Sequence, residues 1–249
     1  MSGHSKWASI KHQKAVTDAR RGQLFTKLTR EIIVSVKKGG PNPDVNFSLR
    51  LAIQKARDNS MPSDNIDRAI KRGSGATEGA TFVELVLEGY GPSGGAILVQ
   101  ALSDNRNRTV QNIRNIFSRG GGNMGESGCV AWLFDSRGVI RVKADGQDPE
   151  ELTLQAIDAG AEDVAEEDEF LTIYTQPTDL MSIRTTFEQA GIAVESAELA
   201  MVPKTSIDLE EKPALQTLKL MDKLEENEDV RTVSTNVNFT DAVLEQYQQ

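Results

Sequence analysis

Hydrophobic residues recur with helical spacing through the first third of the chain. Between residues 20 and 38, apolar side chains gather on one side of a predicted helix and basic side chains on the other, at about 100° per residue. The run Gly39-Gly40-Pro41 predicts the end of that helix. Similar spacing predicts a second helix over 46–59 and a third over 62–73. Residues 1–75 are therefore expected to be helical.

The hydrophobic pattern then changes to short runs rich in Val, Leu and Ile, which are typical of strands. Two such runs, a helix over 106–119 and an apolar strand over 129–134 predict the order β-β-α-β. Residues 139–201 predict the order β-α-β-β-α-β of a ferredoxin-like domain. A helix over 213–226 and an extended segment over 230–239 complete the pattern.

These elements predict an α+β protein of three domains, one all-helical at the N-terminus and two α+β, at least one of them ferredoxin-like. Residues 1–78 form a basic N-terminal arm and the helical domain. Residues 79–134 plus 204–249 form a discontinuous α+β domain, because the last helix and strand supply what the β-β-α-β unit lacks. Residues 135–203 form the inserted ferredoxin-like α+β domain.

Charge is unevenly distributed along the 249 residues. The net charge of −9 divides into +9 over residues 1–75, +1 over residues 76–143 and −19 over residues 144–249. Such segregation is typical of a basic binding region joined to an acidic body. The alternative is that each domain drifted in charge without a function. Because the basic residues also share helix faces, we favour binding to a polyanion.

Composition also bears on the compartment. The mean hydropathy is −0.40, and no apolar run approaches the roughly 18 residues that a spanning helix needs, so no membrane partner is expected. The first residues, MSGHSKWASIKHQK, lack the apolar core of a secretory signal. The single cysteine, Cys129, excludes a disulfide framework and a cysteine-based zinc site. We therefore expect a cytoplasmic protein.

The candidate nucleic-acid-binding residues are basic side chains of the arm, of the first two predicted helices and of the segment that opens the helix over 106–119. Lys27, Arg30 and Lys37 are expected to form one binding face, since they share a side of their helix. The alternative is an ordinary solvated helix surface. The full set is Lys6, Lys11, His12, Lys14, Arg20, Arg21, Lys27, Arg30, Lys37, Lys38, Arg50, Arg57, Arg106 and Arg108.

Arg106 and Arg108 stand in the first turn of a predicted helix, where the helix dipole disfavours positive charge by roughly a few tenths of a kcal/mol. A neighbouring anion would offset this cost. An external phosphate fits two guanidinium groups beside free helix amides. An internal carboxylate, Glu84 or Glu88, is the alternative, and the sequence leaves both open.

No pattern in the sequence predicts an enzyme. The run over 120–125 matches G-x-G-x-x-G formally, but it follows a helix and precedes a strand, the reverse of a dinucleotide site. The two histidines, His4 and His12, lack an accompanying carboxylate cluster, and Cys129 lies in an apolar run typical of an inert thiol. We therefore expect no catalytic residue, metal, cofactor or small-molecule substrate.

Motifs spread along the chain resemble those of the YebC/PmpR family, and the resemblance covers essentially all of it. It implies a three-domain fold, with one helical and two α+β domains. It also implies a cytoplasmic, non-enzymatic protein of the kind described as a probable transcriptional regulator that binds DNA. The motifs are GHSKW at 3–7, KGG at 38–40, NSMP at 59–62, EGYGP at 88–92, DNRNRT at 104–109 and the Gly-rich loop at 120–132.

The resemblance leaves the type of nucleic acid open. Relatives include the mitochondrial translational activator of cytochrome oxidase subunit one, and bacterial members have been tied to ribosomes stalled on proline runs. The expected function is a nucleic-acid-binding regulator, with DNA and transcription favoured. The alternative is a ribosome-associated translation factor that acts through ribosomal RNA contacts to relieve stalling at proline runs. Phosphate contacts are alike on both polymers and carry no sequence information, so the sequence does not separate the two.

Overall fold

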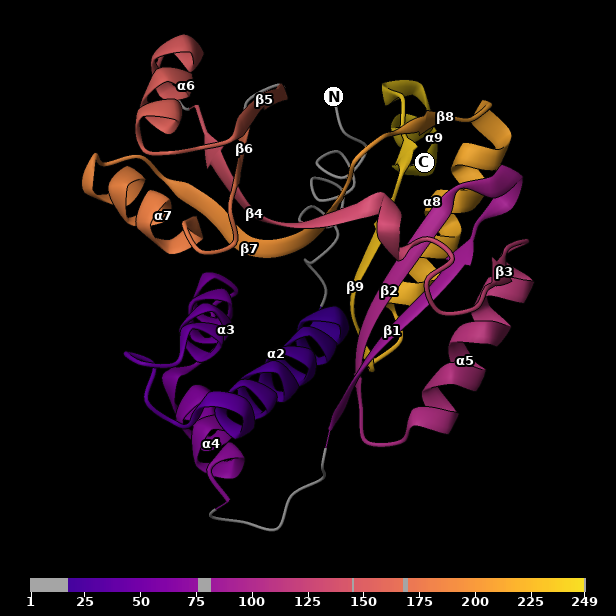
Figure 1. Ribbon diagram of the computed structural model, residues 1–249, viewed down its shortest axis with the longest axis horizontal. Coiled ribbons are helices and arrows are strands. Elements are labelled where there is room, and N and C mark those ends of the chain that lie inside the picture. Colours follow the sequence, from indigo (N-terminus) through magenta and orange to yellow (C-terminus); the bar gives the residue numbers. More distant parts are fainter. Residues whose placement is uncertain (1–17, 76–81, 145, 168–169, 249) are drawn as a thin grey trace.

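The first part of the chain is helical, as the sequence predicts. The computed structural model describes residues 18–75, 82–144, 146–167 and 170–248. The apolar faces of three helices meet in one core, built around residues such as Leu28, Ile32 and Leu49. The elements, drawn in indigo and purple in Figure 1, are α2 (Asp18–Gly39), α3 (Phe47–Asp58) and α4 (Ser63–Gly73).

A buried asparagine fixes the corner between the first two helices. The side-chain oxygen of Asn46 accepts a hydrogen bond from the backbone N–H of Leu49 at 3.1 Å, which caps α3. Its amide nitrogen donates to the backbone carbonyl of Ser35 in α2 at 2.8 Å. One side chain therefore satisfies both a helix start and a buried carbonyl, and it sets the angle at which α3 leaves α2.

A second body is an antiparallel sheet with strand order β3-β1-β2-β9. Two helices, α5 and α8, cover one face of this sheet and share a core with it through Phe117, Leu218 and Val233, while α9 packs against α8 (Figure 1). The last strand comes from the far end of the sequence and pairs with β2. The bounds are β1 (Val83–Tyr90), β2 (Ala96–Ser103), α5 (Arg106–Arg119), β3 (Asn123–Met124), α8 (Glu211–Glu225), β9 (Val230–Thr235) and α9 (Asp241–Gln248).

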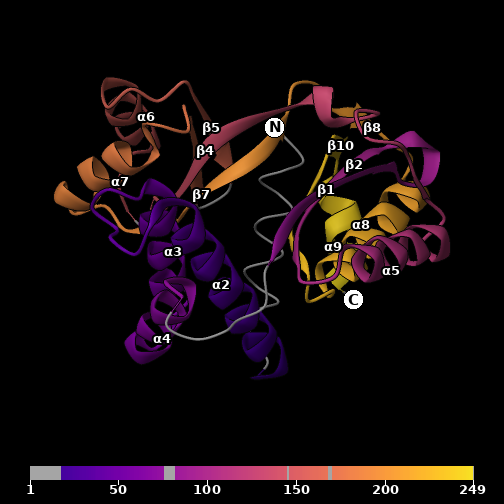
Figure 2. The same ribbon diagram turned by 60° about the horizontal axis from the view of Figure 1, so that its bottom comes forward.

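The third body is an antiparallel sheet with strand order β5-β6-β4-β7. Its own core joins Ile140, Ile173 and Phe187, and α3 lies beside its edge strand β7 (Figures 1 and 2). The long pair of β4 and β7 runs from this sheet toward the second body. The bounds are β4 (Phe134–Lys143), α6 (Pro149–Asp158), β5 (Asp163–Glu167), β6 (Phe170–Thr175), α7 (Leu180–Gln189) and β7 (Val194–Pro203).

The strand predicted over 129–134 is wrong. Residues 131–133 form a short 3₁₀ turn, and the strand β4 begins only at Phe134. The backbone N–H groups of Val130 and Ala131 donate to the carboxylate of Glu88 instead of to a neighbouring strand. The structure also adds the small parallel pair β8 (Ile207–Asp208) and β10 (Val237–Asn238), which the sequence pattern did not predict.

Candidate nucleic-acid interface

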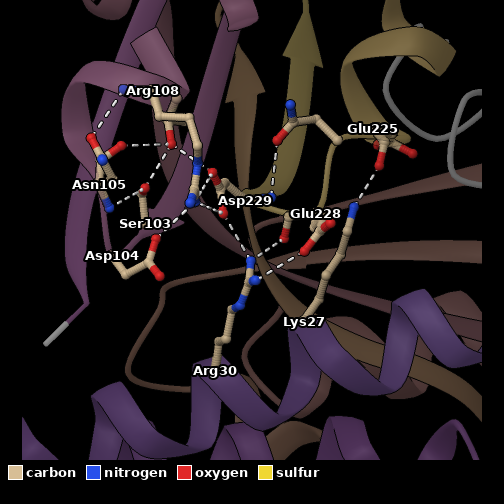
Figure 3. Close-up of polar contacts among 11 residues, drawn as sticks. Lys27, Arg30, Ser103, Asp104, Asn105, Arg108, Glu225, Glu228 and Asp229 are labelled. Atoms are coloured by element: carbon tan, nitrogen blue, oxygen red, sulfur yellow. Dashed lines mark hydrogen bonds and ion pairs between the residues drawn. The ribbon is translucent and has the colours of Figure 1, made fainter. Parts of the chain in front are cut away.

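The basic side of α2 faces the sheet bodies. The ammonium nitrogen of Lys27 lies 2.5 Å from the backbone carbonyl oxygen of Glu225 at the end of α8. Arg30 is only 16% exposed, and its Nη1 lies 2.9 Å from Oδ1 of Asp229 and 2.7 Å from the carbonyl oxygen of Glu228 (Figure 3). Lys27 and Arg30 are therefore engaged within the molecule, and the binding face of Lys27, Arg30 and Lys37 stays a prediction.

Asp229 is the centre of this cluster. It is 5% exposed, and it accepts hydrogen bonds from Arg30, from Nη2 of Arg108 at 3.0 Å and from the hydroxyl of Thr109 at 2.6 Å (Figure 3). Burial raises the pKa of the Asp229 carboxyl, but the hydrogen bonds from Thr109 and Arg108 and the two positive charges outweigh burial and lower its pKa below the ordinary value. One carboxylate thus ties α2, α5 and the segment before β9 together.

The two arginines at the start of α5 have different surroundings. Asn105 caps the helix by accepting from the backbone N–H of Arg108. The Arg108 side chain pairs with Asp104 at 2.7 Å and with Asp229, so its anion is internal. Arg106 is exposed, and no carboxylate pairs with it among the residues that the structure describes. The external-phosphate explanation therefore remains for Arg106 alone.

The carboxylates that the sequence offered as arginine partners bind elsewhere. Glu84 pairs with Lys38 at 2.5 Å, and both side chains are largely exposed. Glu88 is 4% exposed, and it accepts the backbone N–H groups of Gly128, Val130 and Ala131 at 2.6 to 2.8 Å. Burial raises the pKa of Glu88, but these three hydrogen bonds outweigh burial and lower it.

Glu88 thereby holds a loop that presents Trp132 beside Tyr90, the last residue of β1. The hydroxyl of Tyr90 and the indole N–H of Trp132 donate to the same backbone carbonyl, that of Cys129, at 3.0 and 3.2 Å. Trp132 is 66% exposed and Tyr90 is 39% exposed. Glycine at position 122 permits the preceding turn, since a Cβ there would lie 2.6 Å from the carbonyl oxygen of Tyr90.

The remaining predicted residues fall into three groups. Arg21, Lys37 and Arg57 are exposed, and the guanidinium of Arg21 lies 5.6 Å from the ring centre of Phe25. Arg50 is half-buried and donates to backbone carbonyls of the loop before α3. Lys6, Lys11, His12, Lys14 and the side chain of Arg20 lie outside the described residues.

Sequence reasoning missed two further sets of cations. Arg114 and Arg119 are exposed on α5, and Lys212, Lys219 and Lys223 are exposed on α8. The signal for the lysines was their recurrence at i, i+7 and i+11, which places them on one side of a helix. The net negative charge of the C-terminal third drew attention away from this recurrence of lysines.

Charged side chains also line a small cleft where the three bodies meet. The cleft has a volume of about 110 Å³, and Glu31, Lys55, Glu198 and Arg231 contribute to its wall. Lys55 lies 3.0 Å from Glu198, and burial lowers its pKa, but the charges of Glu31 and Glu198 outweigh burial and raise it. These charges neutralise one another, so the cleft presents little net charge to a ligand.

A metal-ligand cluster and a membrane-spanning helix each place requirements on the described ranges. Within them, no group of three or more His, Cys, Asp or Glu side chains is arranged to hold a metal ion. No helix among them is long and apolar enough to cross a lipid bilayer. Burial raises the pKa of the half-buried Cys129 thiol, and the charge of Glu88 adds to the effect, so the thiol is held in its less reactive protonated form.

Comparison with known proteins assigns the chain to a family. The profile of the TACO1/YebC protein N-terminal domain matches residues 5–76, and that of the TACO1/YebC second and third domain matches residues 82–237. The chain belongs to the TACO1/YebC family. TACO1/YebC proteins are a non-enzyme family, so the expectation of no catalytic activity is confirmed. The expected mixed α+β fold, with a helical N-terminal part followed by two sheet-containing parts, is confirmed as well.

Relatives in this family carry the name of regulators. A probable transcriptional regulatory protein of Dehalococcoides mccartyi is 58% identical over 99% of this chain and 98% of its own length. A protein of the same name from Halothermothrix orenii is 50% identical over 99% and 98%. The crystal structure of a conserved hypothetical protein from Aquifex aeolicus superposes with a TM-score of 0.87 at 45% identity, covering 95% of this chain and 98% of that one.

Proposed function

We propose that this TACO1/YebC protein is a cytoplasmic, non-enzymatic transcriptional regulator that binds DNA. Exposed cations that pair with no described carboxylate support it, namely Arg21 on α2, Arg57 on α3 and Arg106 on α5. Such side chains are available to phosphates, whereas Lys27 and Arg30 are engaged within the molecule. The printed names of the relatives agree with this function. The arm residues Lys6, Lys11, His12 and Lys14, together with Arg20, stay predicted contacts.

The test is the salt dependence of binding to duplex DNA. Neutralising about 4–6 phosphates gives a slope of log K against log salt of roughly −4 to −5. The experiment measures fluorescence anisotropy of a labelled mixed-sequence duplex at several salt concentrations. A slope near zero would contradict binding through phosphates.

One observation favours a second function, that of a ribosome-associated translation factor. The exposed Trp132 stands on the loop that Glu88 fixes, and Tyr90 at the end of β1 donates to the same backbone carbonyl as Trp132. Unstacked RNA bases stack on such aromatic side chains. A sedimentation profile of cell lysate separates the two functions, because a translation factor migrates with ribosomes and a DNA-binding regulator co-purifies with chromosomal DNA.

We also infer the domain division of 1–78, 79–134 plus 204–249, and 135–203. Pairing of β9 with β2 supports a discontinuous second domain. The strand order β5-β6-β4-β7, with helices α6 and α7 connecting the strands, supports a ferredoxin-like third domain. Limited proteolysis in the segments that precede β4 and follow β7, followed by mass analysis of the fragments, tests this division.

A further inference from the structure

The outer surface of α5 consists of polar side chains that carry no negative charge. The sequence of the helix is RNRTVQNIRNIFSR, without an aspartate or a glutamate. Thr109, Ile113 and Phe117 are buried against the sheet. The exposed polar positions are Arg106, Asn107, Arg108, Gln111, Asn112, Arg114, Asn115, Ser118 and Arg119.

Three amide side chains lie in a row along this surface. Asn107, Gln111 and Asn115 are spaced four residues apart, so they follow one another along one side of the helix. Arg114 and Arg119 stand on opposite flanks of the row, at about 100° per residue. None of these five side chains makes a hydrogen bond or ion pair with another described residue. Contacts within the described part of the chain therefore give no reason for this set of residues.

The neighbouring helix continues the positive surface. Lys212, Gln216, Lys219 and Lys223 are exposed on α8 at i, i+4, i+7 and i+11, and so share one side. The two helices pack closely on the same face of the sheet (Figures 1 and 2), since a Cβ at Gly120 would lie 2.7 Å from the Leu220 side chain. These lysines lie in the third of the chain that has a net charge of −19. General composition therefore does not explain the stripe.

This layer also carries acidic side chains outside α5, among them the exposed Glu211 and the half-buried Glu225 on α8 and the exposed Asp241 on α9. On α8, Glu226 follows the helix and pairs with Lys223 at 2.7 Å, and Asp222 is half-buried. On α9, Glu245 is exposed. At the start of α5, Asp104 pairs with Arg108. The centre and the C-terminal half of α5 thus present amides and guanidinium groups alone.

From these observations we infer that the outer surface of α5 enters the major groove of B-form DNA, and that the α8 lysines contact the adjoining phosphates. This inference rests on the proposed function, and it names the surface and the polymer. The amide row supplies paired donors and acceptors, which match the major-groove edge of adenine, and arginine matches guanine or phosphate. The 14 residues of α5 give a helix of about 21 Å, and a helix of about 10–12 Å diameter fits a groove about 12 Å wide.

Double-stranded RNA does not fit the same surface. The major groove of an A-form helix is deep and narrow, and side chains on a helix do not reach its base edges. An RNA duplex offers α5 only phosphates and the 2′-hydroxyls of its shallow groove. The surface is therefore expected to prefer the DNA duplex of equal length and sequence, and this preference is measurable with the parent protein.

The experiment compares two variants of equal charge change. Arg114→Gln with Arg119→Gln alters α5, and Lys71→Gln with Arg72→Gln alters exposed side chains of α4 as the matched control. The probe is a mixed-sequence DNA duplex of about two helical turns, or about 20 base pairs. The α5 variant is expected to bind about tenfold more weakly than the parent, with the salt slope less negative by about 2. The control is expected to bind as the parent does.

A second variant tests base reading separately from charge. Gln111→Ala with Asn115→Ala removes two amides and leaves the charge unchanged, so the salt slope is expected to stay as in the parent. The spread of affinities among duplexes of different sequence is expected to shrink, because each bidentate amide contact discriminates by a measurable factor. Thermal melts of all variants establish that each one is folded.

The outcomes separate failure of the α5 surface from failure of DNA binding itself. If the parent binds the duplex and the α5 variant binds equally well, the α5 surface is overturned while DNA binding stands. If the parent binds no duplex DNA, the proposed function fails and the inference fails with it. Equal or tighter binding of the parent to the matched RNA duplex overturns the assignment to B-form DNA.

Discussion

Asp229 determines the surroundings of two arginines that the sequence placed among nucleic-acid contacts. Arg30 and Arg108 come from helices far apart in the chain, and both donate to this carboxylate. Arg114 and Arg106 have the same charge but no described partner. Residue type and helical spacing are alike for all four. Only the fold, which brings residue 229 beside residue 30, separates internal cations from available ones.

Replacing Asp229 with asparagine is expected to destabilise the protein. The variant removes the negative charge from a side chain that is 5% exposed and replaces one of its two acceptor oxygens with an NH₂ group, so a single oxygen remains for Arg30, Arg108 and Thr109. Hydrogen bonds to charged groups contribute about 1–3 kcal/mol, and we expect a loss of that size in the free energy of unfolding measured with urea. Asp104→Asn, at an exposed site, is the control. It should change the free energy of unfolding by less than about 0.5 kcal/mol.

The same carboxylate predicts a dependence on pH. Its pKa is lower in the folded protein than in the unfolded chain, where it lies at about 3.9. The stabilisation is therefore complete above the unfolded pKa and disappears as the pH falls through the folded pKa. The difference in unfolding free energy between the parent and Asp229→Asn should be constant above about pH 5 and shrink below about pH 4. A difference that persists unchanged into acid would contradict the assigned charge state.

At the scale of elements, Glu88 is expected to govern the order of the loop before β4. In Glu88→Gln the new NH₂ group does not accept hydrogen bonds, so one oxygen remains for the three backbone donors of Gly128, Val130 and Ala131. We expect faster hydrogen exchange at these amides and a loss of about 1–3 kcal/mol in unfolding free energy. Glu84→Gln is the control, since its partner Lys38 is exposed. Unchanged hydrogen-exchange rates in Glu88→Gln would show that the loop stays ordered without the Glu88 carboxylate.

The local sequence pattern predicted most helices and strands. The elements that it failed to predict depend on tertiary contacts. The bounds of α5 matched the predicted 106–119, because its cap at Asn105, its apolar spacing and its terminal glycine all lie within one short stretch. The apolar run over 129–134 looked like a strand, but the carboxylate that captures its amides belongs to residue 88. The helix α9 was missed because its eight residues gain their stability from packing on α8.

The candidate nucleic-acid interface was likewise predicted from the sequence only in part. The sequence identified α2 as amphipathic and basic, which is correct, but it predicted a binding face on the basic side, where Lys27 and Arg30 contact the body that contains β9. Val34 on that side was the one signal to the contrary, and it is 7% exposed in the structure. An apolar residue amid cations marks a face that packs against something. The α5 surface escaped notice because asparagine and glutamine were not counted with the charged residues.

At the scale of the whole molecule, several ion pairs join the helical part to the sheet bodies, and we call the two whose side chains are most buried the ionic junctions. The Arg30–Asp229 pair joins α2 to the body that contains β9. On the other side, Arg184 of α7 is 4% exposed and makes two hydrogen bonds with Asp58 of α3, at 2.8 and 2.9 Å. Each body also has a hydrophobic core of its own. The bodies are therefore expected to keep their internal structure when the junctions are broken.

This arrangement predicts how the molecule responds when both junctions are weakened. Asp58→Asn and Asp229→Asn each remove the carboxylate of one junction, and each single variant keeps the other junction. We expect the radius of gyration from small-angle X-ray scattering to stay near the parent value in the single variants and to rise in the double variant. The far-UV circular dichroism should stay unchanged in all three, because the helices and strands belong to the separate cores.

The matched control replaces two exposed carboxylates, Asp67 and Asp104, with asparagine, so that the charge change is the same and neither junction is broken. A radius of gyration in the double variant equal to that of this control would show that apolar contacts and the remaining ion pairs, such as Lys55–Glu198, hold the bodies together. Separation of the bodies would leave α5 on its sheet, since that contact belongs to one core. The double variant should therefore keep its affinity for duplex DNA if α5 and α8 form the binding surface. It should lose affinity if the surface requires the helical part as well.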